Sequence, residues 1–430
     1  MKEDIERPHH FSSAENDEHV TNSVKRRSPS ELEDKIQHED SNYTKIQTEF
    51  DDMCDDAIEK ILSYLELVDL TNICGVSRRL QTIAKSIFSR KHGHWLICID
   101  ATQFPIERFD PLSVYCKIKP IIRISEAKMW FKLIRNFGKS IKYIQIETDS
   151  VFIDKGIKPS FYKYIIEYII EYSADSLEVI ELLNYPFMPL NKPLKNLTKI
   201  IALSDEHIKF DAIEYIPNVN SLWLKWIPKI LKNICFPNMN ELKTSDQDVE
   251  SFISFLRVNR QIKKLRVIIH SDSDLILSSI SEILPKLKTL KIVFSCSLRR
   301  LSMEKIPFYQ FKSVENFSMK SDYHYIGSFV FDNLKRLSLG IEDGNSDWLN
   351  AAIRMKKLKI LKLTHASMLI KNYQILLTKL TELELIIVRF SKQHESNVLI
   401  QSLGREWKQV QMEKIDCLYD TYKVKFQRKR

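Results

Sequence analysis

The chain has 430 residues, of which 44% are hydrophobic and 28% are charged, a composition typical of a soluble folded protein. No run of about 18 apolar residues occurs, so the sequence predicts no membrane-spanning helix. The first residues, MKEDIERPHH, are polar, and we expect no signal peptide. The net charge of +9 divides into −5 for residues 1–50, which hold 7 basic and 12 acidic residues, and +14 for the remainder.

Residues 1–48 are rich in Glu, Asp, Ser, Asn and His and show no apolar periodicity, so they predict a disordered tail. Beyond the tail, the basic residues are spread along the chain and alternate with Glu and Leu, with few aromatic residues between them. This pattern indicates a solvated surface and disfavours nucleic acid as a partner.

The seven cysteines are scattered, odd in number and include no Cys-x-x-Cys pair. This usage predicts reduced thiols in an intracellular protein of the cytoplasm and/or nucleus, and it argues against a zinc module. With 8 glycines the chain has no Gly-rich phosphate loop, and neither a Gly-x-Ser-x-Gly nor a His-Glu-x-x-His motif is present. The sequence therefore predicts no catalytic residues, no metal site and no cofactor.

Residues 50–92 predict three short helices. The first begins at Asp55 and Asp56, whose charges favour a helix N-terminus, and Asp69 and Ser77 are expected to cap the second and third. Three helices of this size bury too little surface to be stable alone, so they require a partner or a neighbouring domain. Apolar residues recur at helical spacing, at Ile58, Ile61, Leu62 and Leu65, then Leu70, Ile73 and Cys74, then Leu80, Ile83, Ala84, Ile87 and Phe88.

Residues 49–92 resemble an F-box, the module that docks a substrate receptor onto the Skp adaptor of a Skp–cullin–F-box ubiquitin ligase. The family pattern falls on Ile58, Ile61, Leu65, Asp69, Leu70, Val76, Ser77, Arg78 and Arg79, whereas Met53-Cys54 replaces the usual Leu-Pro and Leu80 the usual Trp. An ordinary helical cap on a larger core is the alternative. The resemblance implies that the adaptor binds Met53, Cys54, Ile58, Ile61, Leu62, Leu65, Leu70, Val76, Ser77 and Leu80.

Beyond residue 92, apolar triplets with the spacing i, i+3, i+5 recur. Single triplets arise by chance, but from residue 177 the steps are 20, 22, 20, 23, 25, 27, 20, 24, 22 and 27 residues, with a mean of 23. This mean lies within the period of leucine-rich repeats, about 20–29 residues. Charged residues between the apolar ones predict short strands with one buried face. The triplets begin at Ile141, Leu177, Leu197, Val219, Met239, Ile262, Leu287, Val314, Leu334, Leu358, Leu380 and Trp407.

Amphipathic stretches between the triplets predict helices at 248–259, 273–284 and 346–355, and strand-like runs at 95–99 and 120–124 extend the series toward the F-box. Residues 93–430 are therefore predicted to form an α/β leucine-rich-repeat solenoid, with a curved parallel sheet inside and helices outside. The asparagine that usually follows the strand is absent from most copies. A doubly wound parallel sheet is the alternative, but it would have longer helices and a glycine-rich phosphate turn.

The outward strand residues are the candidates for substrate binding. Trp223 is expected to be an exposed anchor, and a basic middle followed by Glu382 and Glu384 would select an acidic or phosphorylated segment by charge. Ordinary solvated strand positions are the alternative. The predicted substrate-binding residues are Trp223, Lys225, Lys264, Arg266, Lys291, Arg336 and Lys362.

The resemblance implies a substrate-recognition subunit of a Skp–cullin–F-box ubiquitin ligase. Its F-box would bind the Skp adaptor and, through it, cullin, while the solenoid holds a protein substrate for ubiquitination and proteasomal degradation. Such a subunit is non-catalytic and acts by tethering, which raises the local concentration of substrate lysines. Two alternatives remain open: a leucine-rich-repeat scaffold without a ligase role, and a nucleic-acid binder that uses the basic strand face.

Overall fold

The computed structural model divides the chain into two units, Met1–Tyr64 and Leu65–Arg430, and each is considered by itself. The predicted disordered tail lies outside the described residues. The described residues are 52–100, 121–124, 127–147, 159–183, 187–188, 190, 192–203, 209–210, 216–270, 273–295, 308–320, 328–340, 347–364, 370–390, 401, 403, 406–416 and 421–429.

The first unit contributes helix α2 (Asp55–Leu62). The helices of the second unit are α3 (Leu67–Ile73), α4 (Arg78–His92), α5 (Ala127–Phe137), α7 (Pro159–Ser173), α8 (Val249–Val258), α9 (Ser273–Ile283), α10 (Asp347–Arg354) and α11 (Ile370–Lys379), with 3-10 turns η2 (Gly138–Ser140) and η4 (Lys229–Leu231). None of the described helices is both long enough and apolar enough to cross a membrane.

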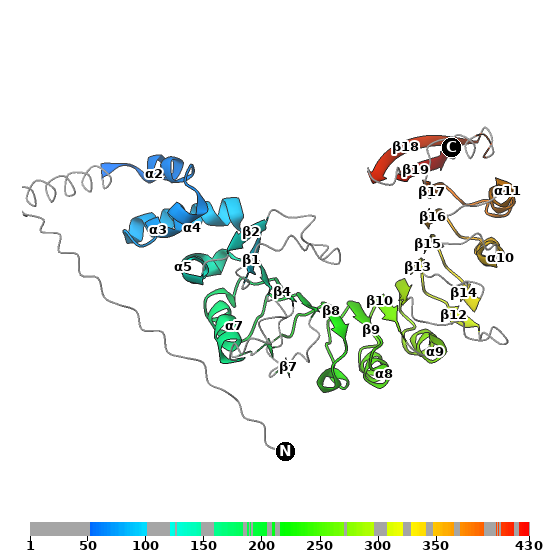
Figure 1. Ribbon diagram of the computed structural model, residues 1–430, viewed down its shortest axis with the longest axis horizontal. Coiled ribbons are helices and arrows are strands. Elements are labelled where there is room, and N and C mark those ends of the chain that lie inside the picture. Colours follow the sequence, from blue (N-terminus) through cyan, green and yellow to red (C-terminus); the bar gives the residue numbers. More distant parts are fainter. Residues whose placement is uncertain are drawn as a thin grey trace, which may run out of the picture. The chain divides into compact units, whose positions relative to one another are not determined.

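The second unit is built around one large sheet, in which the described residues form 15 strands in the order β18-β19-β17-β16-β15-β13-β11-β10-β9-β8-β6-β4-β3-β1-β2 (Figure 1). From β2 to β17 all neighbours are parallel, and β17 is followed by the antiparallel pair β19 and β18. The strands are β1 (Leu96–Asp100), β2 (Ile121–Ile124), β3 (Tyr143–Glu147), β4 (Val179–Leu183), β6 (Lys199–Leu203), β8 (Ser221–Trp226), β9 (Glu241–Ser245), β10 (Lys264–Ile269), β11 (Thr289–Phe294), β13 (Asn316–Lys320), β15 (Arg336–Gly340), β16 (Ile360–Thr364), β17 (Leu385–Phe390), β18 (Trp407–Asp416) and β19 (Thr421–Arg428).

The strands follow one another in the sheet almost in chain order, as a tandem repeat requires. The one inversion among the parallel strands is at the N-terminal end, where β2 lies outside β1 and the chain then returns to place β3 beside β1. The strands predicted at 95–99 and 120–124 therefore exist, but the second forms the sheet edge.

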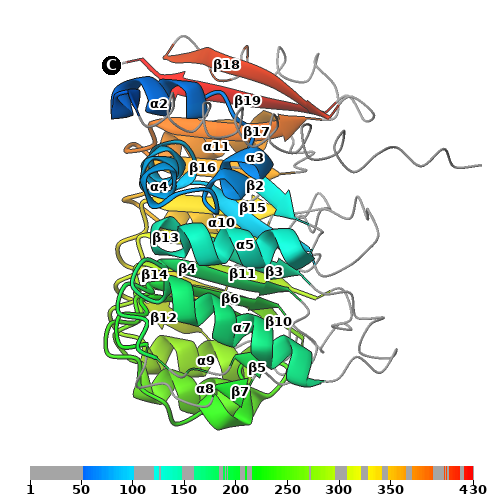
Figure 2. The same cartoon turned by 90° about the vertical axis from the view of Figure 1, so that its left-hand side faces the viewer.

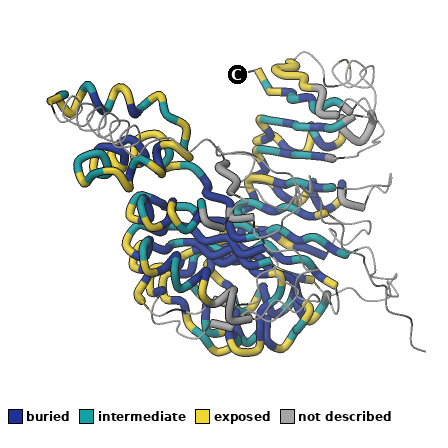
Figure 3. The backbone as a smooth tube through the Cα atoms, turned by 60° about the vertical axis from the view of Figure 1, so that its left-hand side comes forward, coloured by how far each residue is buried: buried dark blue, intermediate teal, exposed yellow. Residues whose placement is uncertain are grey.

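Helices α5 and α7–α11 lie on one face of the sheet (Figures 1 and 2). We call the opposite face the open face, since no helix of the described residues covers it. Burial alternates along strands β10, β11, β13 and β15, but not along β4, of which every residue is buried. In β10, Leu265, Val267 and Ile269 are buried, whereas Lys264 is exposed and Arg266 is half-buried. The buried residues form a continuous apolar layer between strands and helices, seen as the dark blue strand segments in Figure 3.

The predicted helices at 248–259, 273–284 and 346–355 are confirmed as α8, α9 and α10. Other connections are not helical, which is a correction to the simple alternation of strand and helix. In these the chain forms short outer strands, β5 (Phe187–Met188) with β7 (Lys209–Phe210) and β12 (Tyr309–Phe311) with β14 (Phe329–Phe331), or only the turn η4. Aromatic stacking stabilises one pair, since the Phe311 and Phe331 rings lie 5.8 Å apart between centroids.

A hydrogen-bond ladder joins the repeats at the beginning of each main-sheet strand from β4 to β17. Two successive N–H groups of one repeat donate to a single carbonyl of the preceding repeat, as Lys335 and Arg336 do to Glu315 at 2.8 and 2.9 Å. The acceptor always follows the first residue of the apolar triplet. The acceptor carbonyls are those of Lys142, Glu178, Thr198, Asn220, Asn240, Lys263, Lys288, Glu315, Lys335 and Lys359.

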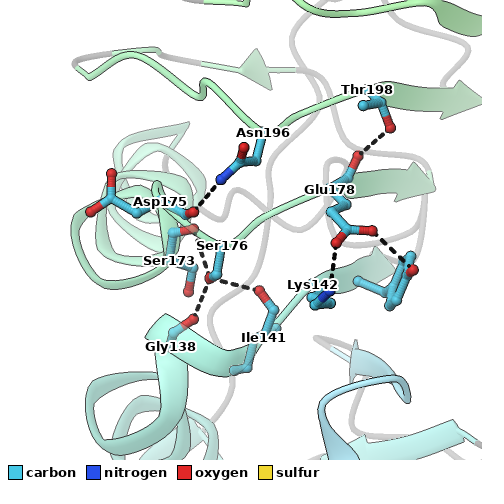
Figure 4. A network of polar contacts seen from close by, with 10 residues as sticks. Gly138, Ile141, Lys142, Ser173, Asp175, Ser176, Glu178, Asn196 and Thr198 are labelled. Atoms are coloured by element: carbon cyan, nitrogen blue, oxygen red, sulfur yellow. Dashed lines mark hydrogen bonds and ion pairs between the residues drawn. The ribbon is translucent and has the colours of Figure 1, made fainter. Parts of the chain in front are cut away.

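A second ladder is formed by the polar side chains that directly precede seven of the triplets. The Asn196 amide donates to the Asp175 carbonyl at 2.5 Å, and the Ser176 hydroxyl donates to the Gly138 carbonyl at 2.7 Å (Figure 4). These side chains bond to the backbone of the preceding repeat, and the polar residue before the apolar triplet is their signal in the sequence. Equivalent bonds to the preceding repeat come from Asn218, Asn238, Gln261, Ser313 and Asn333.

Two predicted triplets are wrong in detail. The ladder places Glu384 and Leu385 opposite the Lys359 carbonyl, so the repeat begins at Leu383, three residues after the predicted Leu380. Ile386 and Val388 are accordingly buried, and Glu382 and Glu384 precede the strand. The triplet at Trp407 is not a repeat at all, because β18 pairs antiparallel with β19.

Asn259 tests the packing of the repeats, because its fully buried amide takes part in four hydrogen bonds, of which the one from the Gln261 amide is long, at 3.5 Å. It accepts from the Phe236 N–H at 2.8 Å and donates to the carbonyls of Ile234 and Phe255 at 2.8 and 3.0 Å. We expect Asn259→Leu to lower the free energy of unfolding by about 3 kcal/mol, because buried partners lose their bonds. The control Asn333→Leu removes two exposed bonds, to the Lys312 carbonyl and from the Lys357 ammonium, and should cost less than about 1 kcal/mol. Urea unfolding measures both, and equal losses would contradict this account.

Candidate functional site

Helix α2 presents different residues to the interior and to the solvent. Asp55 and Asp56 lie in its first turn, where their charges favour the helix N-terminus, but the N-cap residue is Cys54 and makes no side-chain bond. Ile58 and Leu62 are buried, whereas Ile61 is 44% exposed. Tyr64, just beyond the helix, is 80% exposed.

Helices α3 and α4 are continuous with the sheet domain. The Asn136 amide of α5 donates to the Thr71 carbonyl of α3 at 3.2 Å, and the ring of Phe88 in α4 stacks on Phe137 of α5 at 4.3 Å. The predicted cap at Ser77 is confirmed, since its hydroxyl accepts from the Leu80 N–H at 3.2 Å. The predicted cap at Asp69 is wrong, because the N-cap of α3 is Glu66 and Asp69 lies in the first turn.

The ten residues predicted to bind the adaptor separate by exposure. Ile58, Leu62 and Leu70 are buried, and their role as contact residues stays a prediction. The helical periodicity identified them because it marks the packed side of each helix. The remaining seven reach the surface: Cys54, Ile61 and Val76 are exposed, and Met53, Leu65, Ser77 and Leu80 are half-buried.

Sequence reasoning missed two exposed apolar side chains in this segment, Tyr64 and Val68, of which the second is 50% exposed. Val76, which was predicted, is 69% exposed. The available signal was an apolar residue off the packed face of a short helix. Such residues are costly to leave in water unless a partner covers them.

The residues predicted to bind substrate are strand residues of the open face. The registers align Arg266 with Lys291, and then Ser318, Ser338 and Lys362 on the strands that follow. Arg336 lies two residues before Ser338 on β15, and Lys264 two residues before Arg266 on β10. The structure therefore brings the predicted basic residues of β10–β16 onto one surface.

Trp223 does not fit its predicted role as an exposed anchor, since it is 8% exposed. The Nζ atoms of Lys199 and Lys243 lie 3.3 and 4.6 Å from the centre of its ring. The indole therefore makes cation–π contacts with two lysines of the protein itself. Burial lowers the pKa of Lys199 to about 8. Lys225, by contrast, is exposed, with its Nζ 5.3 Å from the Trp226 ring.

Side chains of metal-binding type do not gather among the described residues in groups of three. His92 packs against the rings of Phe88 and Trp95, with ring centroids 5.6 and 4.6 Å away, and burial lowers its pKa. This environment accounts for His92 as a packing residue at the end of α4.

Comparison with protein-family models finds that residues 50–92 match the F-box domain. The match covers the segment that contains α2, α3 and α4 and agrees with the resemblance drawn from the sequence. A search of the curated proteins finds none that matches the chain. The chain thus contains an F-box domain, a class of module that generally binds a Skp adaptor.

The cysteines of this domain offer a test of its packing. Cys74 is 6% exposed, and burial raises the pKa of its thiol to about 11, so at pH 7.5 it is protonated and shielded. Cys54 is exposed, and we expect iodoacetamide to label it at least about tenfold faster, because alkylation requires an accessible thiolate. Peptide mass spectrometry measures both rates. Rapid labelling of Cys74 in the native chain would show that α3 does not bury it.

Proposed function

We propose that the chain is the substrate-recognition subunit of a Skp–cullin–F-box ubiquitin ligase. The F-box match at residues 50–92 is the observation that carries the proposal, because the recurrent task of this module is to bind the Skp adaptor. Adaptor binding would use exposed apolar residues of the matched segment 50–92, among them Ile61, Tyr64, Val68 and Val76. Through the adaptor the chain would join cullin.

The large sheet would serve as the substrate-binding part, and we interpret it as an irregular leucine-rich-repeat solenoid. Sequential parallel strands, repeated ladders before each strand and helices on one face support this interpretation. The open face is the surface for a protein substrate, since its basic strand residues project away from the helices. In this role the chain is not an enzyme: it tethers the substrate near a ubiquitin-loaded enzyme, in the cytoplasm and/or nucleus, and marks it for proteasomal degradation.

Adaptor binding is tested by co-purification of the full chain with a Skp adaptor. We expect Ile61→Asp with Val76→Asp to weaken the complex at least about tenfold, because each substitution places a charge against an apolar partner surface. Both side chains are exposed, so the fold should tolerate the change, and circular dichroism checks this. The matched control is Ser86→Asp, an exposed position of α4 outside the predicted set. No complex with the wild type, or equal loss in the control, would refute adaptor binding.

The receptor role is separated from a scaffold role by protein half-lives in cells that express the chain. A receptor predicts a set of proteins whose half-lives lengthen both on deletion and in the Ile61→Asp, Val76→Asp variant, since the two changes break the same tether. Quantitative pulse-chase proteomics measures this. Ser86→Asp should leave the half-lives unchanged. A scaffold predicts no change in half-life in any of these cells, and that result would exclude the receptor role.

A further inference from the structure

The open face has a marked charge asymmetry in its C-terminal half. The six strands β10, β11, β13, β15, β16 and β17 contain no Asp or Glu. Burial of the alternate residues places all of their basic side chains on the open face. The basic residues, which we call the open-face cations, are Lys264, Arg266, Lys291, Lys320, Arg336, Lys362 and Arg389.

Lysines at the beginnings of these strands are neutralised, in contrast to the open-face cations. Glu315 lies between Lys288 and Lys335, with N–O distances of 2.8 and 2.9 Å, and their hydrogen bonds lower its pKa to about 2. Lys359 pairs with Glu384 at 3.2 Å. Among the described residues, no salt bridge includes any of the open-face cations.

Several open-face cations repel one another in a partly desolvated setting. The pKa of Lys291 is lowered, first by burial and then by the charges of Arg266, Lys362 and Lys320. Burial also lowers the pKa of Arg266, and its Nε has no hydrogen-bond partner among the described residues. Desolvated like charges disfavour the folded state, so an anion placed among them would gain more than it would at an ordinary surface.

The arrangement of the charges distinguishes a long anionic chain from a single compact anion. Lys291 and Lys362 are separated by the two intervening strands that carry Ser318 and Ser338 in the same row. With neighbouring strands about 4.8 Å apart, the row from Arg266 to Lys362 extends about 19 Å. An extended peptide rises about 3.3 Å per residue, so about six residues would span this row. Carboxylates spread along a peptide therefore suit the row better than one phosphate group.

We infer that the open face binds an extended, carboxylate-rich protein segment, which lies across strands β10 to β16 with its Asp and Glu side chains beside the open-face cations. The small side chains of Ser318 and Ser338 allow the peptide backbone to approach the sheet between Lys291 and Lys362. Their hydroxyl groups can donate to carboxylates that are not opposite a cation. This inference rests on the proposed function, because it names the class of segment by which a substrate would be held.

The test measures fluorescence anisotropy of the full chain with a labelled peptide of about ten residues that alternates Glu and Ser. We expect saturable binding at physiological salt, with no binding of the peptide in which Gln replaces Glu. Lys291→Gln with Lys362→Gln should weaken binding at least about tenfold, because two charge-assisted contacts are lost. The thermal midpoint of this variant should equal or exceed that of the wild type, since repulsion on the open face falls.

The matched control is Lys286→Gln with Lys312→Gln, which removes the same charge from two exposed lysines that precede the strands. Neither lysine is an open-face cation, and physiological salt screens charges over about 8 Å, so binding should change less than about twofold. Equal weakening in both variants would overturn the inference. So would tighter binding of a Gln/Ser peptide that carries one phosphoserine, or of a single-stranded oligonucleotide.

The outcome is independent of adaptor binding. Loss of peptide binding in Lys291→Gln with Lys362→Gln should leave co-purification with the Skp adaptor unchanged, because these strands lie outside residues 50–92. If the adaptor binds but the Glu/Ser peptide does not, the inference fails while the proposed function stands. If the peptide binds but the adaptor does not, the open face is a binding surface of a protein without the proposed ligase role.

Discussion

The second unit depends on the hydrogen-bond ladder at the beginning of each main-sheet strand from β4 to β17. Two N–H groups of one repeat share one carbonyl of the repeat before it, and this arrangement recurs from Lys142 to Lys359. Each bond contributes only about 1 kcal/mol, but together the bonds set the same register at every step. A common register aligns equivalent side chains into rows across the sheet. The apolar layer beneath the helices and the cation row on the open face are two consequences of this one constraint.

The strands could be predicted because the spacing of the apolar triplet indicates which residues face the core, and this spacing is a local property of the sequence. The residue at which the last repeat begins could not be predicted. Leu380 and Leu383 are both fully buried, and both begin a triplet of the correct spacing. Only the pairing of Glu384 with the Lys359 carbonyl decides between them, and this contact joins residues 25 positions apart. The antiparallel end of the sheet is likewise a non-local pairing, without a signature in the triplet.

Periodicity predicted the helices of residues 50–92 but not their surface. It identifies the side of a helix that packs, and Ile58, Leu62 and Leu70, which were predicted to bind the adaptor, are buried. Tyr64 and Val68 are exposed because they fall off that side. Trp223 was correctly predicted to lie on a strand, but it was predicted to be exposed and is buried. The lysines that contact its ring come from neighbouring strands, and contacts between strands cannot be identified from one sequence. Exposure is therefore the property that the sequence predicts least well here.

Folding alone does not account for the charge of the open face. At the beginnings of the strands, where Glu315 and Glu384 occur, lysines form ion pairs, so the sequence does provide acids where a cation needs one. Within the strands themselves the pattern differs. Six neighbouring strands, from β10 to β17, carry basic residues and contain no Asp or Glu. Neutral polar residues would suit the open face at a lower electrostatic cost, as Ser318 and Ser338 do in the same row. Unpaired basic residues that repel one another are expected on a surface that binds a negatively charged partner. Binding of that partner would relieve the electrostatic repulsion that remains in the folded protein.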